Sequence, residues 1–200
     1  MIKNIIFDFG DIFINLDKPA VFKKMEAFGY TEYTVALDIL CKDYETGLMS
    51  SNDFLADLKE MYPKATETDL LDAWNSILLD FPEYRLEFIE ELKTKKSHRL
   101  FLLSNTNDIH IEYVKKTMGL ERFERFRNCF EGFYLSQQIK MRKPNTNIYE
   151  YVLNENSLVP EETLFIDDTK ANTDSAQKLG IQCWNLLVGK EDIVELNKKL

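Results

Sequence analysis

The sequence predicts an α/β fold, in which a parallel sheet forms the core and a block of helices is inserted after the first strand. Three observations lead to this prediction. The apolar run at residues 5–7 is typical of a buried strand, and it ends at Asp8 and a glycine turn. Residues 97–200 alternate between strand-like and helix-like segments, whereas residues 17–96 carry helical periodicity only. We therefore expect a core of residues 1–16 and 97–200 with an α-helical cap over 17–96.

The alternating region predicts a Rossmann-like sheet, because strands that alternate with helices pair in parallel through crossover connections. The expected strands cover residues 99–103, 130–135, 163–166 and 181–187, and the expected helices cover 109–118, 147–153 and 171–179. Gly119 and Gly180 follow two of these helices, at positions where a glycine commonly ends a helix.

The helical block has five stretches in which apolar residues recur every three to four positions, at residues 21–28, 35–40, 54–61, 70–78 and 86–92. Two patterns, Ser50 with Asp53 and Thr66 with Asp69, are typical of capping boxes at helix starts. Because the first strand has to join the sheet of the later region, we expect this block to lie above the carboxyl ends of the strands.

Composition and charge disfavour several classes of partner. The chain has 200 residues, of which 44% are hydrophobic, and its formal net charge of −9 argues against nucleic acid and anionic membranes. Its cysteines, Cys41, Cys129 and Cys183, are widely spaced and are expected to be reduced thiols, and His98 and His110 lack metal-ligand spacing. The sequence shows no signal-like segment and no long apolar segment, so we expect the protein to be cytoplasmic. We also expect a monomer or a homodimer.

Acidic residues follow two of the expected strands. Asp8 comes directly after the first strand, and Asp167 and Asp168 follow the strand at 163–166. Ligands of parallel α/β sheets bind just outside the carboxyl ends of the strands, so these carboxylates are expected to lie together. Such a cluster favours a divalent metal ion beside a nucleophile.

Four segments in this order resemble the motifs of the haloacid dehalogenase-like hydrolase superfamily. They are FDFGDIFINLD, LLSNTN, MRKPNTNIY and FIDDTKANTDSAQKLGI. The resemblance covers the whole chain, and the helical block matches the α-helical cap of subfamily I. The wording of the motifs is most similar to bacterial sugar-phosphate phosphatases of the α-glucose-1-phosphate phosphatase type. This resemblance implies a Mg²⁺-dependent phosphatase that acts on a small phosphorylated metabolite.

The chemistry of the motif residues agrees with this reading. A carboxylate can attack phosphorus and form an aspartyl-phosphate, and Asp8 is the expected nucleophile. Because two anions repel, a Mg²⁺ ion is expected to bridge the carboxylate and the phosphoryl oxygens. Its expected ligands are Asp8, the Gly10 carbonyl and Asp168, with Asp167 either a direct ligand or one shell further out.

The other motif residues are expected to bind the substrate. Ser104, Asn105 and the neighbouring backbone N–H groups at a helix start would hold phosphoryl oxygens, although Ser104 has an alternative role as a helix N-cap. Lys143 would neutralise charge on the phosphoryl group, and Asn172 would orient the acidic pair or Lys143. Specificity is expected at the cap rim, residues 44–49.

One position departs from the resemblance. Most phosphatases of the superfamily carry a second Asp two positions after the nucleophile as general acid/base, whereas this chain has Gly10 there and Asp11 next. The α-glucose-1-phosphate phosphatase branch resembles this chain in having a glycine at that position. A good leaving group needs less protonation, and Asp11 is a weaker candidate acid because an adjacent side chain usually points elsewhere.

Two other functions stay open at this point. A 2-haloacid dehalogenase uses the same nucleophilic carboxylate without a metal, but the Asp167-Asp168 pair argues against it. A non-catalytic phosphate-binding protein is favoured only by Gly10. Phosphate release from an aryl phosphate, with and without Mg²⁺, separates the three hypotheses.

Overall fold

The computed structural model describes residues 1–200 and contains the expected parallel sheet. Its strands are β1 (Asn4–Phe7), β2 (Arg99–Ser104), β3 (Gly132–Leu135), β4 (Thr163–Asp167) and β5 (Gln182–Asn185). They lie in the order β3-β2-β1-β4-β5, and every neighbouring pair is parallel. The first strand therefore sits at the centre of the sheet, between strands that follow it by about a hundred residues or more.

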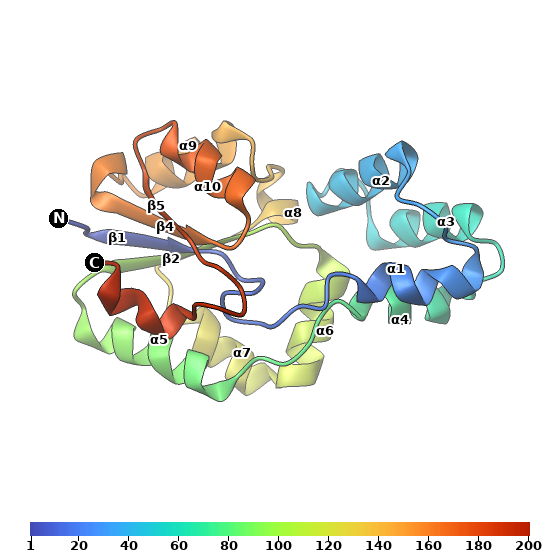
Figure 1. Ribbon diagram of the computed structural model, residues 1–200, viewed down its shortest axis with the longest axis horizontal. Coiled ribbons are helices and arrows are strands. Elements are labelled where there is room, and N and C mark those ends of the chain that lie inside the picture. The colour runs from blue at the N-terminus through green and yellow to red at the C-terminus, as the bar shows by residue number, and fades with distance from the viewer.

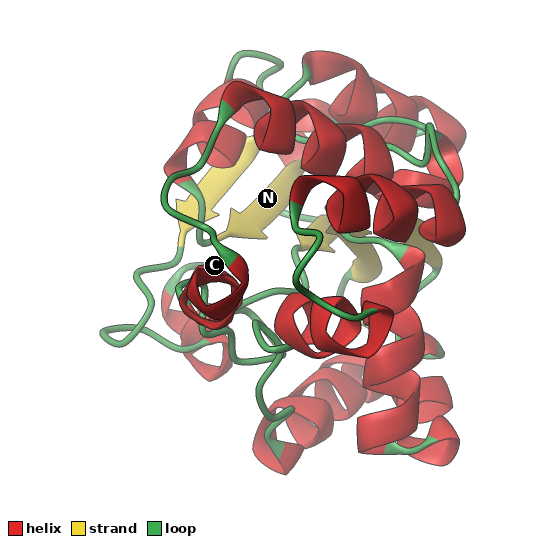
Figure 2. Ribbon diagram, turned by 90° about the vertical axis from the view of Figure 1, so that its right-hand side faces the viewer, coloured by secondary structure: helices red, strands yellow, loops and turns green.

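Helices cover both faces of the sheet (Figures 1 and 2). One face packs against α5 (Glu83–Lys95), α6 (Asp108–Met118), α7 (Leu120–Arg127) and the 3-10 helix η3 (Ile193–Lys198), and the other packs against α9 (Thr146–Glu155) and α10 (Lys170–Gln177). Residues of β1 alternate between the two layers, since Ile5 and Phe7 belong to the first hydrophobic cluster and Ile6 to the second. Short helices α8 (Ser136–Ile139) and η2 (Pro160–Glu162) precede α9 and β4.

A second body of helices extends from one end of this core (Figure 1). It contains α1 (Ala20–Met25), η1 (Glu26–Phe28), α2 (Val35–Glu45), α3 (Ser51–Met61) and α4 (Glu67–Asn75), which share their own hydrophobic cluster. Ser50 caps α3 by accepting a hydrogen bond from the Asp53 amide, and Thr66 with Asp69 forms a complete capping box on α4. Both chain termini lie at the end of the core that faces away from these helices (Figure 1).

The last helix of the expected insertion, α5, packs on the sheet. Its residues Leu86 and Ile89 are fully buried in the same cluster as Ile5 of β1, and Phe81 before the helix belongs to that cluster too. We propose that the cap ends near residue 78, because the chain from Phe81 onward contributes its apolar side chains to the core.

Two linkers join cap and core, and they are paired with each other. Leu16 and Leu78 form an antiparallel bridge. The Asn15 amide donates to the Asp80 carbonyl at 2.9 Å, and the Asp17 amide donates to the Ile77 carbonyl at 2.8 Å. The cap is thus attached through a short two-stranded ribbon.

Two α-helices, α7 and α8, and the 3-10 helices η2 and η3 were not predicted from the sequence. Helix α7 follows Gly119 without a break, so that this glycine ends α6 and begins α7. Helix α8 has only four residues, too few for a periodic pattern to show. The predicted strands and helices differ from the observed ones mainly by one or two residues at their ends, where hydrogen bonding is least regular. No helix is long and apolar enough to span a membrane.

Candidate active site

The strand register brings the motif residues to one edge of the sheet. Phe7 lies opposite Leu102 on one side and Ile166 on the other, so the chain positions that follow these residues lie side by side. Asp8 and Asp167 come next on their strands. This edge opens into a cavity of about 360 Å³ between the core and the cap. The cavity is lined by Asp8, Gly10, Lys18, Ser104, Asn105, Lys143, Asp168 and Asn172, among others.

Lys143 lies at the centre of the cluster. Its Nζ lies 2.6 Å from Asp8 Oδ1 and 2.6 Å from Asp167 Oδ2, and it donates to the Leu103 carbonyl at 2.9 Å. The residue is only 1% exposed. Burial lowers the pKa of Lys143, but attraction from Asp167 and Asp8 outweighs this, and the net pKa is raised. A buried ammonium with all three protons bonded is held in one place.

Asp167 is fully enclosed, and both of its oxygens accept hydrogen bonds. Asn172 Nδ2 lies 3.0 Å from each oxygen, and the Thr169 amide donates to Oδ1 at 2.8 Å. Together with Lys143, these donors give both oxygens of the Asp167 carboxylate hydrogen-bond partners. In this geometry Asp167 contacts Lys143, and Asn172 contacts Asp167.

Asp8 and Asp168 keep oxygens that accept no hydrogen bond from the protein. Oxygens of Asp8, Asp167 and Asp168 lie within 4.8 Å of one another. Burial raises the pKa of Asp8 to about 7; Lys143 opposes this shift, while Asp167 and Asp168 add to it. The cluster thus holds more negative charge than one buried ammonium balances.

The donor set fits a hard divalent cation. The Gly10 carbonyl accepts no hydrogen bond from the protein, and it lies in the turn directly after Asp8. Asp8, Asp168 and this carbonyl offer oxygen only, which suits Mg²⁺ rather than Zn²⁺. The three carboxylates carry more negative charge than the buried ammonium of Lys143 balances, and a divalent ion would offset the excess.

Ser104 and Asn105 line the cavity beside Lys143. The Ser104 hydroxyl makes only a long contact of 3.4 Å to the Asn105 carbonyl, and Ser104 is not the N-cap of α6, since Asn107 occupies that position. Asn105 Oδ1 accepts from the Lys143 amide and its Nδ2 donates to the Lys143 carbonyl, both at 2.9 Å. The Ser104 side chain is therefore free to bind a ligand, while the Asn105 side chain holds the Lys143 loop.

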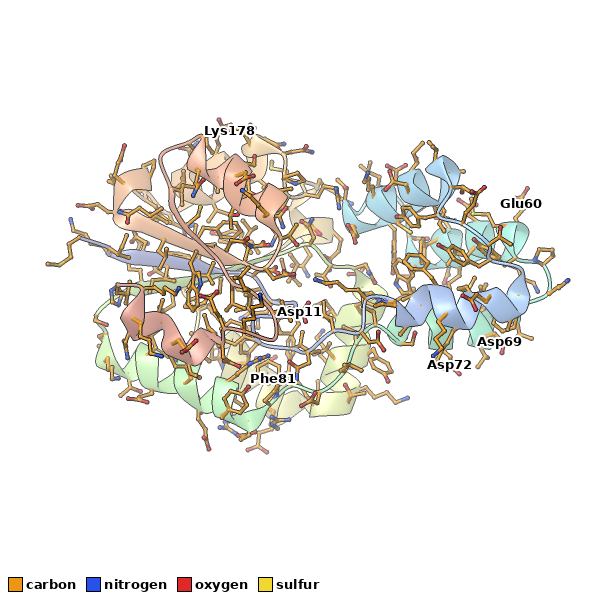
Figure 3. The ribbon with its side chains drawn as sticks, viewed as in Figure 1. Asp11, Glu60, Asp69, Asp72, Phe81 and Lys178 are labelled. Atoms are coloured by element: carbon orange, nitrogen blue, oxygen red, sulfur yellow. The ribbon has the colours of Figure 1, made fainter.

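Gly10 and Asp11 show why no acidic side chain follows Asp8 into the cavity. A Cβ on Gly10 would lie 2.8 Å from Leu16 Cδ1 and 4.0 Å from Asp8 Oδ2, so Leu16 fills the space beside the carboxylate. Asp11 has a left-handed φ of 56° and lines a different cavity. Its Oδ1 accepts from the Leu16 amide at 3.1 Å. Asp11 lies in the body of the core (Figure 3).

Lys18 is a cavity residue that the sequence analysis missed. Its Nζ lies 2.6 Å from Asp168 Oδ2 and 2.9 Å from Asp11 Oδ2, and its side chain is half exposed. Burial lowers the pKa of Lys18, but the bonds to Asp168 and Asp11 raise it more. The sequence offers only a weak signal for this residue, a lysine beside Pro19 where the chain leaves the core.

The cap docks on α6 through aromatic side chains. The Trp74 ring stacks on His110 with ring centroids 5.1 Å apart, and His110 Nε2 lies 3.0 Å from the Trp74 carbonyl. Asn107 Nδ2 lies 3.1 Å from His110 Nδ1, and the Ile109 amide donates to the Tyr44 hydroxyl at 3.2 Å. Burial lowers the pKa of His110 to about 4, against a smaller opposite effect of the Trp74 carbonyl.

The expected rim of the cap contacts α8 and the Lys143 loop. Glu45 Oε2 pairs with Arg142 at 2.8 Å, and the Ser136 hydroxyl donates to the Glu45 carbonyl at 2.6 Å. Gly47 has a φ of 67°, and a Cβ there would lie 2.1 Å from the Gln137 carbonyl oxygen. Glu45 and Arg142 both line the cavity, so cap and core together form its wall. The acids Glu60, Asp69 and Asp72 lie on the outside of the cap (Figure 3).

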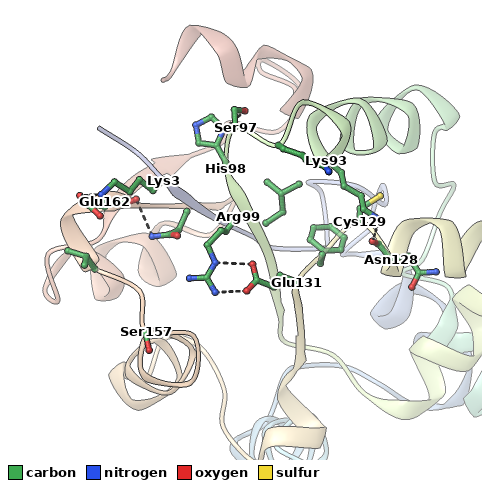
Figure 4. A pocket seen from close by; sticks show the side chains of 15 residues that line it. Lys3, Lys93, Ser97, His98, Arg99, Asn128, Cys129, Glu131, Ser157 and Glu162 are labelled. Carbon is green, nitrogen blue, oxygen red and sulfur yellow. Dashed lines mark hydrogen bonds and ion pairs between the residues drawn. The ribbon is translucent and has the colours of Figure 1, made fainter.

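A larger cavity, about 530 Å³, lies at the opposite edge of the sheet (Figure 4). Four of its charged residues form two ion pairs at the surface. Arg99 makes two bonds to Glu131, at 2.9 and 2.5 Å, and Lys3 lies 2.7 Å from Glu162. No sequence motif maps to this edge.

Comparisons with known proteins agree with this geometry. A family model described as haloacid dehalogenase-like hydrolase matches residues 2–180. The D-ribitol-5-phosphate phosphatase of Bacteroides thetaiotaomicron is 26% identical over 188 residues, which are 91% of this chain and 90% of that protein. These matches span the core, the cap and all four motifs.

Solved structures share the whole arrangement. A haloacid dehalogenase family enzyme from Bacteroides thetaiotaomicron, in complex with magnesium, has a TM-score of 0.85 and 34% identity, covering 95% of this chain and 96% of its own. The wild-type form of that enzyme was also solved with magnesium and inorganic phosphate. A hydrolase of this family from Porphyromonas gingivalis has a TM-score of 0.81 and 30% identity, covering 100% and 98%.

Proposed function

Because the chain belongs to the haloacid dehalogenase-like hydrolase family, we propose that it is a Mg²⁺-dependent phosphatase that forms an aspartyl-phosphate on Asp8. The observation that carries this proposal is the Asp8 carboxylate itself. It ends the central strand of the sheet, lies 2.6 Å from the buried Lys143 ammonium, and lines the cavity beside Asp168. A carboxylate in that position is a fixed nucleophile with an adjacent positive charge.

Different residues carry out the nucleophilic attack and stabilise the negative charge. Asp8 attacks the phosphorus, and the bond from phosphorus to the ester oxygen breaks. The Ser104 hydroxyl donates a hydrogen bond to a phosphoryl oxygen, and the positive charge of Lys143 offsets the negative charge on the phosphoryl group in the transition state. Asp167, held by Asn172, keeps Lys143 in place.

Asp8, Asp168 and the Gly10 carbonyl would hold the metal ion. When bound, Mg²⁺ supplies positive charge that offsets the repulsion between the Asp8 carboxylate and the phosphoryl group. Two relatives support this assignment by their own properties, since one is named a phosphatase and the other was solved with magnesium and phosphate.

We further propose that the substrate is the phosphate ester of a small sugar or sugar alcohol. A cavity of about 360 Å³ suits a small metabolite. Beyond the phosphoryl end, its wall contains the apolar residues Ile77 and Leu78 together with the Glu45–Arg142 pair, which has donors and acceptors for hydroxyl groups. The phosphatase similar to this chain acts, by its name, on a phosphorylated pentitol.

Phosphate release from purified protein tests the proposal. The panel contains an aryl phosphate, ribitol 5-phosphate, α-glucose 1-phosphate and phosphoglycolate, each with Mg²⁺ and with excess EDTA. We expect Mg²⁺-dependent release, fastest from a sugar or polyol ester, and none from the Asp8→Asn variant. Full phosphate release in excess EDTA would contradict the proposed need for Mg²⁺. No release from any ester, with phosphate still bound, would favour a non-catalytic phosphate-binding protein.

A further inference from the structure

We propose that Lys18 is a catalytic residue whose ammonium stabilises the negative charge on the departing ester oxygen. This inference rests on the proposed phosphatase function and concerns the step that Gly10 leaves without a proton donor. Lys18 lines the cavity, and its Nζ contacts Asp168. An oxygen of Asp168 in turn lies within 4.8 Å of an oxygen of Asp8. The Asp168 carboxylate therefore connects the Lys18 ammonium to the nucleophile.

No acid next to Asp8 can protonate the leaving group. Leu16 fills the space where a side chain on residue 10 would begin, 2.8 Å from the Cβ position. Asp11 faces a separate cavity, and its carboxylate is held by the Leu16 amide and by Lys18. General acid catalysis needs a donor within hydrogen-bond reach of the leaving oxygen, which neither position provides.

The other positively charged groups of the cavity, and its histidine, are already engaged. Lys143 uses its three protons on Asp8, Asp167 and a backbone carbonyl. Both ring nitrogens of His110 have partners, and Arg142 pairs with Glu45. Lys18 differs because its side chain is half exposed at the cavity and its ammonium has two partners, whereas that of Lys143 has three.

The position of Lys18 on the linker suits contact with the organic end of the substrate. The residue lies between Leu16, beside the nucleophile, and Pro19, which precedes α1 of the cap. A lysine has a flexible stem of four carbons and three donors, so it can keep Asp168 and still donate to a third group. That group would be the ester oxygen, which leaves on the side of phosphorus opposite Asp8.

The reaction balances with Lys18 as a proton donor that is regenerated. The Asp8 oxygen bonds to phosphorus, and the ester oxygen leaves with the electron pair of the broken bond. Lys18 stabilises the negative charge on this oxygen and passes one proton to it, so the alcohol leaves and Lys18 becomes a neutral amine. Water then attacks the aspartyl-phosphate, a proton of that water returns to Lys18, and free Asp8 and inorganic phosphate remain.

The test compares Lys18→Met with Lys18→Arg on a series of phosphate esters from nitrophenyl to alkyl, at saturating Mg²⁺. We expect Lys18→Met to lower kcat/KM for alkyl esters by about 10²–10³-fold, as for loss of one charge-stabilising donor, with a much smaller loss for nitrophenyl esters. Lys18→Arg should restore part of the alkyl activity. Lys23→Met is the matched control, because Lys23 is an exposed lysine of α1 outside the cavity.

Calorimetric binding of Mg²⁺ and of inorganic phosphate provides the second readout. Both affinities should change little in Lys18→Met if the residue acts on the leaving oxygen. An equal loss for all esters, together with weaker Mg²⁺ binding, would overturn the inference and make Lys18 a support of Asp168. Unchanged kinetics would overturn it as well. A wild-type protein that hydrolyses no ester would overturn the proposed function and this inference together.

Discussion

The two edges of the sheet both carry ion pairs, but they bury them to very different extents. At the carboxyl edge, Lys143 and Asp167 are 1% and 0% exposed and 2.6 Å apart. At the amino edge, Arg99 and Glu131 pair at a similar distance, yet their side chains are 40% and 50% exposed. The amino edge also has the larger cavity, about 530 Å³ against 360 Å³.

This difference shows that buried charge, more than cavity size, identifies the site. Removing two charges from water costs several kcal/mol per ion, and a hydrophobic pair of similar volume is often as stable. Charges that a fold keeps buried despite this cost are commonly used in chemistry. The exposed ion pairs of the amino edge lose little hydration and contribute little to the free energy of unfolding.

Substitution of the nucleophile tests the comparison most strongly. Asp8→Asn should lower phosphate release by more than about 10⁴-fold, because the amide neither attacks phosphorus nor binds Mg²⁺ as a charge. Glu131→Gln, the same type of change in an Arg pair at the amino edge, should leave kcat/KM unchanged. Steady-state kinetics on both purified variants decides this, and comparable losses would contradict the distinction between the edges.

Removal of the buried ammonium should destabilise the protein. Lys143→Met leaves Asp8 and Asp167 buried without their cation, and the free energy of unfolding should fall by about 3–5 kcal/mol. Arg99→Met should cost about 1 kcal/mol or less. Urea unfolding in metal-free buffer measures both. Equal costs would mean that the carboxyl-edge network behaves like a surface pair.

A histidine lines each edge, and their pH responses should differ. The folded pKa of His110 is about 4, below the ordinary value of 6.5. Between pH 4 and pH 6.5 the folded state therefore binds fewer protons than the unfolded state. Stability should therefore fall as the pH drops from about 6.5 to about 4, by up to about 3 kcal/mol. His110→Gln should flatten this part of the unfolding profile, and His98→Gln should flatten it less, because burial lowers the pKa of the partly exposed His98 to a smaller extent. An unchanged slope in His110→Gln would assign the loss to other groups.

Magnesium should stabilise the carboxyl edge alone. At a concentration a hundred times its Kd, Mg²⁺ should raise the free energy of unfolding by about 2.7 kcal/mol, because it binds only the folded site. Asp168→Ala should abolish this gain, and Glu162→Gln at the amino edge should keep it. Thermal unfolding with Mg²⁺ or EDTA gives the measurement. A gain that survives Asp168→Ala would place the ion elsewhere.

The sequence allowed the sheet and its functional edge to be predicted, because both follow from local patterns. Asp8 and Asp167 each end an apolar strand, and parallel pairing alone brings them together. The place of α5 was harder, since its helical periodicity does not tell which body its apolar face covers. Lys18 was missed because its position depends on a turn with a left-handed residue, whose direction no periodic pattern encodes.

The two linkers between core and cap form one structural unit. The bridge between Leu16 and Leu78 and the neighbouring backbone hydrogen bonds join them into a two-stranded ribbon. Two unpaired linkers would restrain the cap less. A shift of one linker past the other would break these bonds, so the pairing restrains the cap against sliding. Lys18 lies next to the ribbon, and its contacts with Asp168 and Asp11 tie it to the core.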